Sequence, residues 1–127
     1  MEYLHLLPDI STLNPFRALV IVTPEWQGNV STWLVKSGCL YMMAWGIECS
    51  SWDDSVDYAN IEYFNYENIP DNKSVVTTWH ENESIEEVFL FSKKDAIHPS
   101  VDLKKTLLVH ISNLHKKREF TNKYNSV

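Results

Sequence analysis

The chain has 127 residues, of which 44% are hydrophobic and 13% aromatic, and its formal net charge is −6. This length predicts one domain over residues 1–127, with a lead-in segment over 1–16 and a single core. Its longest apolar runs are strand-sized, which excludes a membrane helix of about 20 residues. The acidic N-terminus is unlike the basic start of a secretory signal.

The two cysteines, Cys39 and Cys49, are too few for a disulfide framework and lie outside any CxxC spacing. We therefore expect two free thiols in a reducing, cytoplasmic environment. Cys39 opens an apolar run and is predicted to be buried. Cys49 is predicted to be exposed.

The first half of the chain predicts a strand, a helix and a second strand. Arg17–Thr23 is a continuous β-branched run, typical of a strand buried on both faces. Thr23-Pro24-Glu25 then has the features of a helix start, and Gly38 those of a C-terminal cap. Cys39–Trp45 follows as the second strand. One apolar face of the intervening helix is formed by Trp26, Val30, Trp33 and Leu34.

The second predicted helix opens with Ser51 and Asp54 in the spacing of a capping box. Its expected buried stripe consists of Trp52, Val56, Ala59 and Tyr63. Ser74–Trp79 is predicted as the third strand. Ser84 and Glu87 form another capping box, which opens a helix with Ile85, Val88 and Phe91 on one side.

Lys105–Ile111 is predicted as the fourth strand, and a basic helix is expected from about Asn113 to Tyr124. Strands and helices thus alternate along the whole chain, which favours parallel strands with helices on both faces. The predicted fold is α/β, with a small, open, mostly parallel four-stranded sheet of flavodoxin-like or Rossmann-like form. The expected strand order is 2-1-3-4.

Charge is distributed unevenly along the chain. Between Glu48 and Glu87 eleven acidic residues stand against Lys73 alone, a net charge of −10. This sign disfavours nucleic acid as a partner, since a nucleic-acid binder needs a basic face. A basic protein is the natural partner of such a surface, although acidic helices also serve simply as a solvated face.

Aromatic and acidic residues follow the predicted strands at their carboxyl ends, where ligands of open parallel sheets gather. Trp26 and Trp33 are assigned to packing. Trp45, Trp52 and Trp79 are candidate contact residues, because tryptophan provides a large contact area at a small cost in entropy. The full set of predicted partner-binding residues is Asp53, Asp54, Asp57, Glu81, Glu83, Trp45, Trp52 and Trp79.

An enzymatic alternative starts from His80, which could act as a general base if a nearby carboxylate orients it. Glu81 or Glu83 could orient the ring, with Asp53 across the crevice. The competing interpretation is a surface histidine beside capping acids. No glycine-rich phosphate motif and no metal-ligand spacing occurs, so neither a cofactor nor a metal is expected.

The segment SGCLYMMAWGIECSSW, the DDSVDYAN that follows it and the later TTWHENE resemble a family of short bacterial proteins of uncharacterised function. The resemblance covers about Arg17 to His110 and assigns no catalytic residues. In size, acidity and richness in Asn, Tyr and Ser, the chain is also similar to immunity proteins of contact-dependent and polymorphic toxin systems. That second resemblance implies a cytoplasmic protein that neutralises a basic toxin nuclease by binding it.

Overall fold

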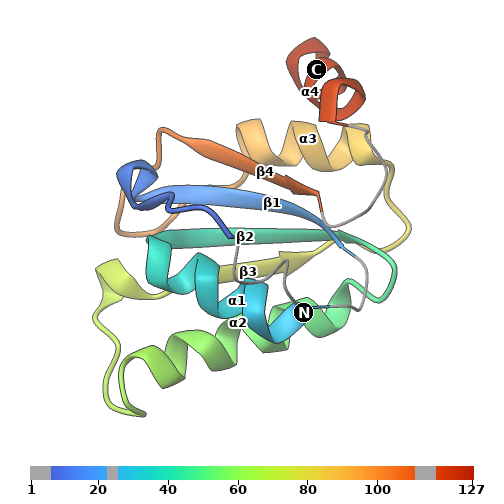
Figure 1. The fold of residues 1–127 in the computed structure, drawn as a ribbon. Coiled ribbons are helices and arrows are strands. Elements are labelled where there is room, and N and C mark those ends of the chain that lie inside the picture. The colour runs from blue at the N-terminus through green and yellow to red at the C-terminus, as the bar shows by residue number, and fades with distance from the viewer. Residues whose placement is uncertain (1–6, 23–25, 111–116) are drawn as a thin grey trace.

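The computed structural model describes residues 7–22, 26–110 and 117–127, in which strands and helices alternate (Figure 1). The strands are β1 (Phe16–Val22), β2 (Cys39–Gly46), β3 (Val76–Trp79) and β4 (Thr106–His110). The α-helices are α1 (Gln27–Ser37), α2 (Ser50–Tyr63), α3 (Ile85–Lys94) and α4 (Lys117–Ser126). Two 3₁₀ turns, η2 (Ser11–Leu13) and η3 (Asp71–Lys73), precede β1 and β3.

The four strands form one open sheet in the order β3-β2-β1-β4, and every pairing is parallel. The α/β prediction is therefore confirmed, whereas the predicted order 2-1-3-4 is wrong. The chain steps outward from β1 to β2 and β3, and then crosses beyond β1 to place β4. The most apolar strands, β1 and β2, occupy the centre, while β3 is short and has no buried residue, as suits an edge.

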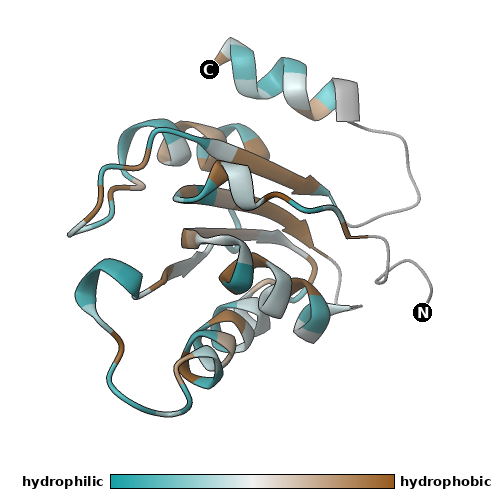
Figure 2. Cartoon of the chain, turned by 60° about the vertical axis from the view of Figure 1, so that its left-hand side comes forward, coloured by the Kyte–Doolittle hydropathy of each residue, from teal (hydrophilic) through white to brown (hydrophobic). Residues whose placement is uncertain are grey.

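Helices cover both faces of the sheet, as predicted, and each face has its own core (Figure 1). Alternate residues of β1 divide between the two cores because successive side chains of a strand point to opposite faces. Ala18, Val20 and Val22 pack with α1 and α2, whereas Leu19 and Ile21 pack with α3. Figure 2 shows the apolar residues concentrated along the strands between the helical layers.

The ends of α1 combine one unexpected and one predicted feature. The helix begins at Gln27 after Trp26, which adopts a left-handed conformation with φ of 65° and gives no side-chain cap. The predicted start at Thr23-Pro24-Glu25 lies outside the described residues. Gly38 caps the C-terminus as predicted, with φ of 100°, a conformation that glycine adopts without steric cost.

The two predicted capping boxes have different outcomes. In α3 the box is confirmed, because Ser84 Oγ accepts from the Glu87 amide at 3.1 Å and Glu87 Oε1 accepts from the Ser84 amide at 3.2 Å. In α2 it is wrong: the helix begins at Ser50, and the Ser51 hydroxyl donates to the carbonyl of Glu48 at 2.9 Å. Ser51 therefore lies inside the helix, and its hydroxyl bonds back to the preceding turn instead of capping the amide of Asp54.

Both cysteines are free, as predicted, and both are buried. Burial raises the pKa of the Cys39 thiol to about 12, because the thiolate is poorly solvated there. The prediction that Cys49 is exposed is wrong, since this residue is the N-cap of α2 and belongs to the same core as Trp52 and Val56.

The last helix ends at Ser126, two residues after the predicted end at about Tyr124. The structure describes α4 from Lys117, and the predicted start at about Asn113 lies outside the described residues. Helix α4 packs on the side of α3, where Tyr124 meets Phe89 edge-on at 5.2 Å between ring centroids. No helix in the described ranges is long and apolar enough to cross a bilayer.

Candidate functional site: the acidic cluster of α2

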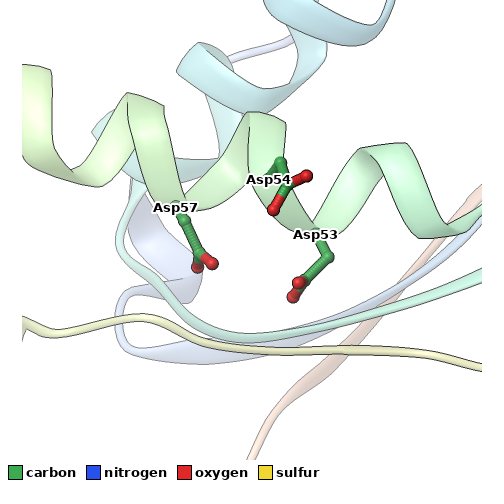
Figure 3. Close-up of side chains that lie close together, drawn as sticks. All are labelled: Asp53, Asp54 and Asp57. Carbon is green, nitrogen blue, oxygen red and sulfur yellow. The ribbon is translucent and has the colours of Figure 1, made fainter.

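Three carboxylates converge on the first turns of α2. One oxygen from each of Asp53, Asp54 and Asp57 lies within 4.8 Å of the other two (Figure 3). Helix geometry explains this grouping, because residues three and four apart lie side by side on a helix surface. We call these three residues the acidic cluster.

Asp57 is the best-anchored member of the acidic cluster. Thr77 Oγ1 on β3 donates to Asp57 Oδ1 at 2.9 Å, which ties the middle of α2 to the edge strand. Burial raises the pKa of Asp57, and the negative charges of Asp53 and Asp54 raise it further, while the bond from Thr77 opposes the shift. Burial is thus the main cause of the raised pKa of Asp57, and the two neighbouring carboxylates add to it.

No lysine or arginine among the described residues forms an ion pair with the acidic cluster. The lysines that form ion pairs among the described residues contact other acids: Lys104 pairs with Asp102, and Lys123 pairs with Glu86 and Glu119. Of the five predicted contact acids, Asp53, Asp54 and Asp57 are thus brought together in space without a described cationic partner, whereas Glu81 and Glu83 lie outside the cluster.

A partly exposed tryptophan lies at the level of this cluster. Helix α2 runs antiparallel to β3, and Asp57 of the helix lies opposite Thr77 of the strand. Moving one turn back along the helix, to Asp53, therefore follows the same direction as moving two residues forward along the strand, to Trp79. These two steps cover similar lengths, about 5–7 Å. The Trp79 side chain is 48% exposed. Trp79 is consequently available for contact beside the acidic cluster.

The other two predicted contact tryptophans have structural roles. Trp52 is completely buried in the core under α1 and α2, so it cannot touch a partner and its assignment as an anchor is corrected. Trp45 is partly buried, and its Nε1 donates to the carbonyl of Glu83 at 2.8 Å. That bond ties the end of β2 to the turn before α3.

His80 is buried, with an exposed fraction of 6%, so the competing interpretation of a surface histidine is wrong. Its Nδ1 lies 3.0 Å from Glu83 Oε2, and its Nε2 lies 2.9 Å from Thr78 Oγ1. The ring packs edge-on against Phe91 of α3, with 4.7 Å between centroids. Both ring nitrogens therefore have partners, and the histidine holds the turn between β3 and α3.

This geometry separates the two residues of the catalytic alternative. His80 faces α3, whereas Asp53 lies on α2, which covers the opposite face of the sheet. Glu83 is the carboxylate that meets the imidazole, and Glu81 is exposed in the same turn. Trp45, Trp79 and His80 line none of the three best-formed hollows on the described surface.

Among the described residues, the acidic cluster is the group whose spacing is most similar to that of metal ligands. Carboxylate oxygens suit Ca²⁺ and Mg²⁺, but those ions take six or more oxygen ligands. Three carboxylates from two successive turns supply only part of such a shell. Their grouping is better described as a focus of negative charge.

Sequence reasoning missed a set of exposed aromatic residues on α2 and just after it. Tyr63 was assigned to the buried stripe of α2 and is instead 52% exposed. Tyr58 and Tyr66 are also exposed, and their hydroxyl oxygens lie 2.8 Å apart. The signal available in the sequence was the tyrosine-rich segment itself, Tyr58 to Tyr66, in which three tyrosines accompany Glu62.

The fold and this site define a small, all-parallel α/β protein with an acidic cluster on α2 that no described lysine or arginine pairs. The chain belongs to the family described as "Domain of unknown function (DUF7684)", whose model matches residues 1–127. This agrees with the resemblance to an uncharacterised family. A search of curated proteins and a search of solved structures each returned no match.

Proposed function

We propose that this protein is a binding module that captures a basic protein through the acidic cluster and the adjacent face of Trp79. The observation that carries the proposal is the convergence of Asp53, Asp54 and Asp57 without a cationic partner among the described residues. Burial and the charges of Asp53 and Asp54 raise the pKa of Asp57, and a lysine or arginine from a partner would favour its ionised form.

The neighbouring residues fit the two parts of an interface. Charges at its border speed the encounter and select the partner, whereas a few aromatic side chains provide most of the affinity. The half-exposed Trp79 and the exposed Tyr58 and Tyr66 are the aromatic side chains in position to do this. Glu81 extends the negative surface beyond the end of β3.

The partner that best fits this surface is a basic nuclease toxin, and the protein would act as its immunity protein in a bacterial cytoplasm. Nucleases carry basic surfaces for their phosphate substrates, and an acidic protein of this size could cover such a surface. This assignment rests on charge complementarity and on the general resemblance to immunity proteins.

The test is a binding measurement with a basic nuclease encoded beside the gene, using wild-type protein and two charge-matched triple variants. The first variant changes Asp53, Asp54 and Asp57 to asparagine. The second, a control, carries Glu62→Gln, Glu67→Gln and Asp71→Asn, which remove the same charge outside the cluster. We expect the cluster variant to lose affinity by about tenfold or more and the control to change much less.

Two outcomes would overturn the proposal. One is equal loss of affinity in the two triple variants, which would make net charge rather than the cluster responsible. The other is the absence of any complex at low salt, where attraction between opposite charges is strongest. Trp79→Ala supplies an independent check, because its loss should increase the dissociation rate while leaving the salt dependence of association intact.

A further inference from the structure

A second feature lies on the other face of the sheet, at the amino end of the central strand β1. Arg17 is the charged residue of that otherwise apolar strand. Its Nη1 donates to Thr106 Oγ1 at 3.0 Å, and its Nη2 donates to the carbonyl of Leu103 at 2.7 Å. Its Nε is buried and has no hydrogen-bond partner.

Arg17 has no carboxylate partner among the residues that the structure describes. A guanidinium group offers five N–H donors, and two of them are used by Thr106 and Leu103, which leaves three. A partly buried positive charge with unused donors is costly unless a negative charge compensates it. Because Nε is buried, the donors left for an anion are the second N–H groups of Nη1 and Nη2.

Arg17 lines a surface pocket of about 320 Å³ together with the segment 97–103. The pocket wall is built rigidly around His98, which is buried. His98 Nε2 donates to the carbonyl of Ser74 at 2.8 Å, while its Nδ1 accepts from the amides of Ser100 and Val101 at 3.1 and 3.2 Å. These bonds hold the segment in place before any ligand arrives.

The rest of the lining narrows the class of ligand. Ile97, Pro99 and Val101 make much of the wall apolar, and Ile97 is 72% exposed. The acid of the pocket, Asp102, is paired with Lys104 at 2.9 Å, with both side chains largely exposed. A dianion such as phosphate is disfavoured, because the carboxylate of Asp102 repels it and the pocket offers few hydrogen-bond donors. A monoanion with an apolar body matches both the single guanidinium and the apolar wall.

We propose that this pocket binds a small organic carboxylate, with its carboxylate group on the Arg17 guanidinium and its apolar body against Ile97 and Pro99. Arginine suits this ligand because its planar fork matches the geometry of a carboxylate. The site is separate from the acidic cluster in sign of charge, in position and in ligand class.

The experiment titrates the full-length protein with benzoate at constant ionic strength and follows the Arg17 Nε–H resonance by NMR. We expect a saturable shift of that resonance. Arg17→Lys should weaken binding by about tenfold, which corresponds to about 1.4 kcal/mol, because lysine keeps the charge and loses the fork. Inorganic phosphate, added in a parallel titration, should bind more weakly than benzoate.

A second pair of variants tests the pocket without touching Arg17, in case its bonds to Leu103 and Thr106 are needed for folding. Ile97→Glu places a negative charge beside the site and should weaken benzoate binding. Leu90→Glu makes the same change at another exposed apolar residue, on α3 and outside the pocket, and should leave binding unchanged. The proposal is wrong if benzoate gives no saturable shift, if phosphate binds as tightly, or if the two glutamate variants behave alike.

Discussion

The electrostatic strain of the acidic cluster leads to a prediction about stability. Replacing Asp57 by asparagine removes one of three mutually repelling charges and keeps an oxygen that accepts the hydrogen bond from Thr77. At 4.8 Å or less, each pair of carboxylates repels by about 1 kcal/mol at the dielectric constant of water. After allowance for exposure and salt, we expect D57N to raise the free energy of unfolding by about 0.5–1 kcal/mol.

The pH dependence of this gain follows from the direction of the pKa shift. The pKa of Asp57 in the folded protein is raised above the ordinary value of 3.8. A raised carboxyl pKa stabilises the folded state at pH values below 3.8. This stabilisation is lost as the pH rises through the pKa of Asp57 in the folded protein. The advantage of D57N over wild type should therefore be small in acid, grow as Asp57 ionises and level off towards neutral pH.

The assay is urea unfolding at neutral and acidic pH, at low and high salt, with Glu62→Gln as the control. Glu62 is an exposed acid of the same helix outside the cluster, and its replacement should change stability by no more than about 0.5 kcal/mol. About 1 M salt should suppress the D57N gain, because the Debye length there falls to about 3 Å. A D57N protein less stable than wild type at neutral pH would refute the reasoning.

Two further predictions concern burial and capping. Trp52→Ala should cost about 3–5 kcal/mol of stability, because the side chain is fully buried. Trp79→Ala, at a half-exposed site, should change stability by no more than about 0.5 kcal/mol. Thermal unfolding followed by circular dichroism compares the two variants, and equal losses would contradict the assignment of Trp79 as a contact residue. Ser84→Ala should lose about 0.5–2 kcal/mol by removing the cap of α3, measured by urea unfolding against Ser126→Ala at the exposed C-terminal end.

The elements that local patterns predicted well are those whose cause is local. The β-branched run after Arg17 formed β1, and Ser84 with Glu87 formed the predicted capping box. Strand order has no such local cause, since one parallel crossover can place the next strand on either side of the sheet. The predicted order failed for this reason, although the alternation of strands and helices was correct.

The candidate site was predictable where helix spacing alone brings residues together. Asp53, Asp54 and Asp57 were all chosen from the sequence, and their grouping follows from the period of α2. Trp52 shows the limit of this reasoning, because the same residue fitted both the buried stripe of a helix and an interface anchor. Only the packing of α2 against the sheet, which involves distant segments, decides in favour of burial.

Arg17 was overlooked because it opens a run of apolar residues that the sequence explains completely as a buried strand. The partners that give it significance, Leu103 and Thr106, lie far along the chain and reach it only through the pairing of β4 with β1. A single charge at the border of a strand therefore carries little meaning until the neighbouring strand is known.

The sheet itself separates the two proposed sites, and this makes them independently testable. Arg17 lies on β1 beside β4, with its pocket formed by the segment after α3, whereas the acidic cluster lies on α2 across the opposite face. No described ion pair or hydrogen bond links the two sets of residues. Asparagine substitutions in the cluster should therefore leave benzoate binding unchanged, and Ile97→Glu should leave capture of the basic partner unchanged. If either change altered the other site, the two surfaces would belong to one binding region, and the division of roles between the faces would have to be abandoned.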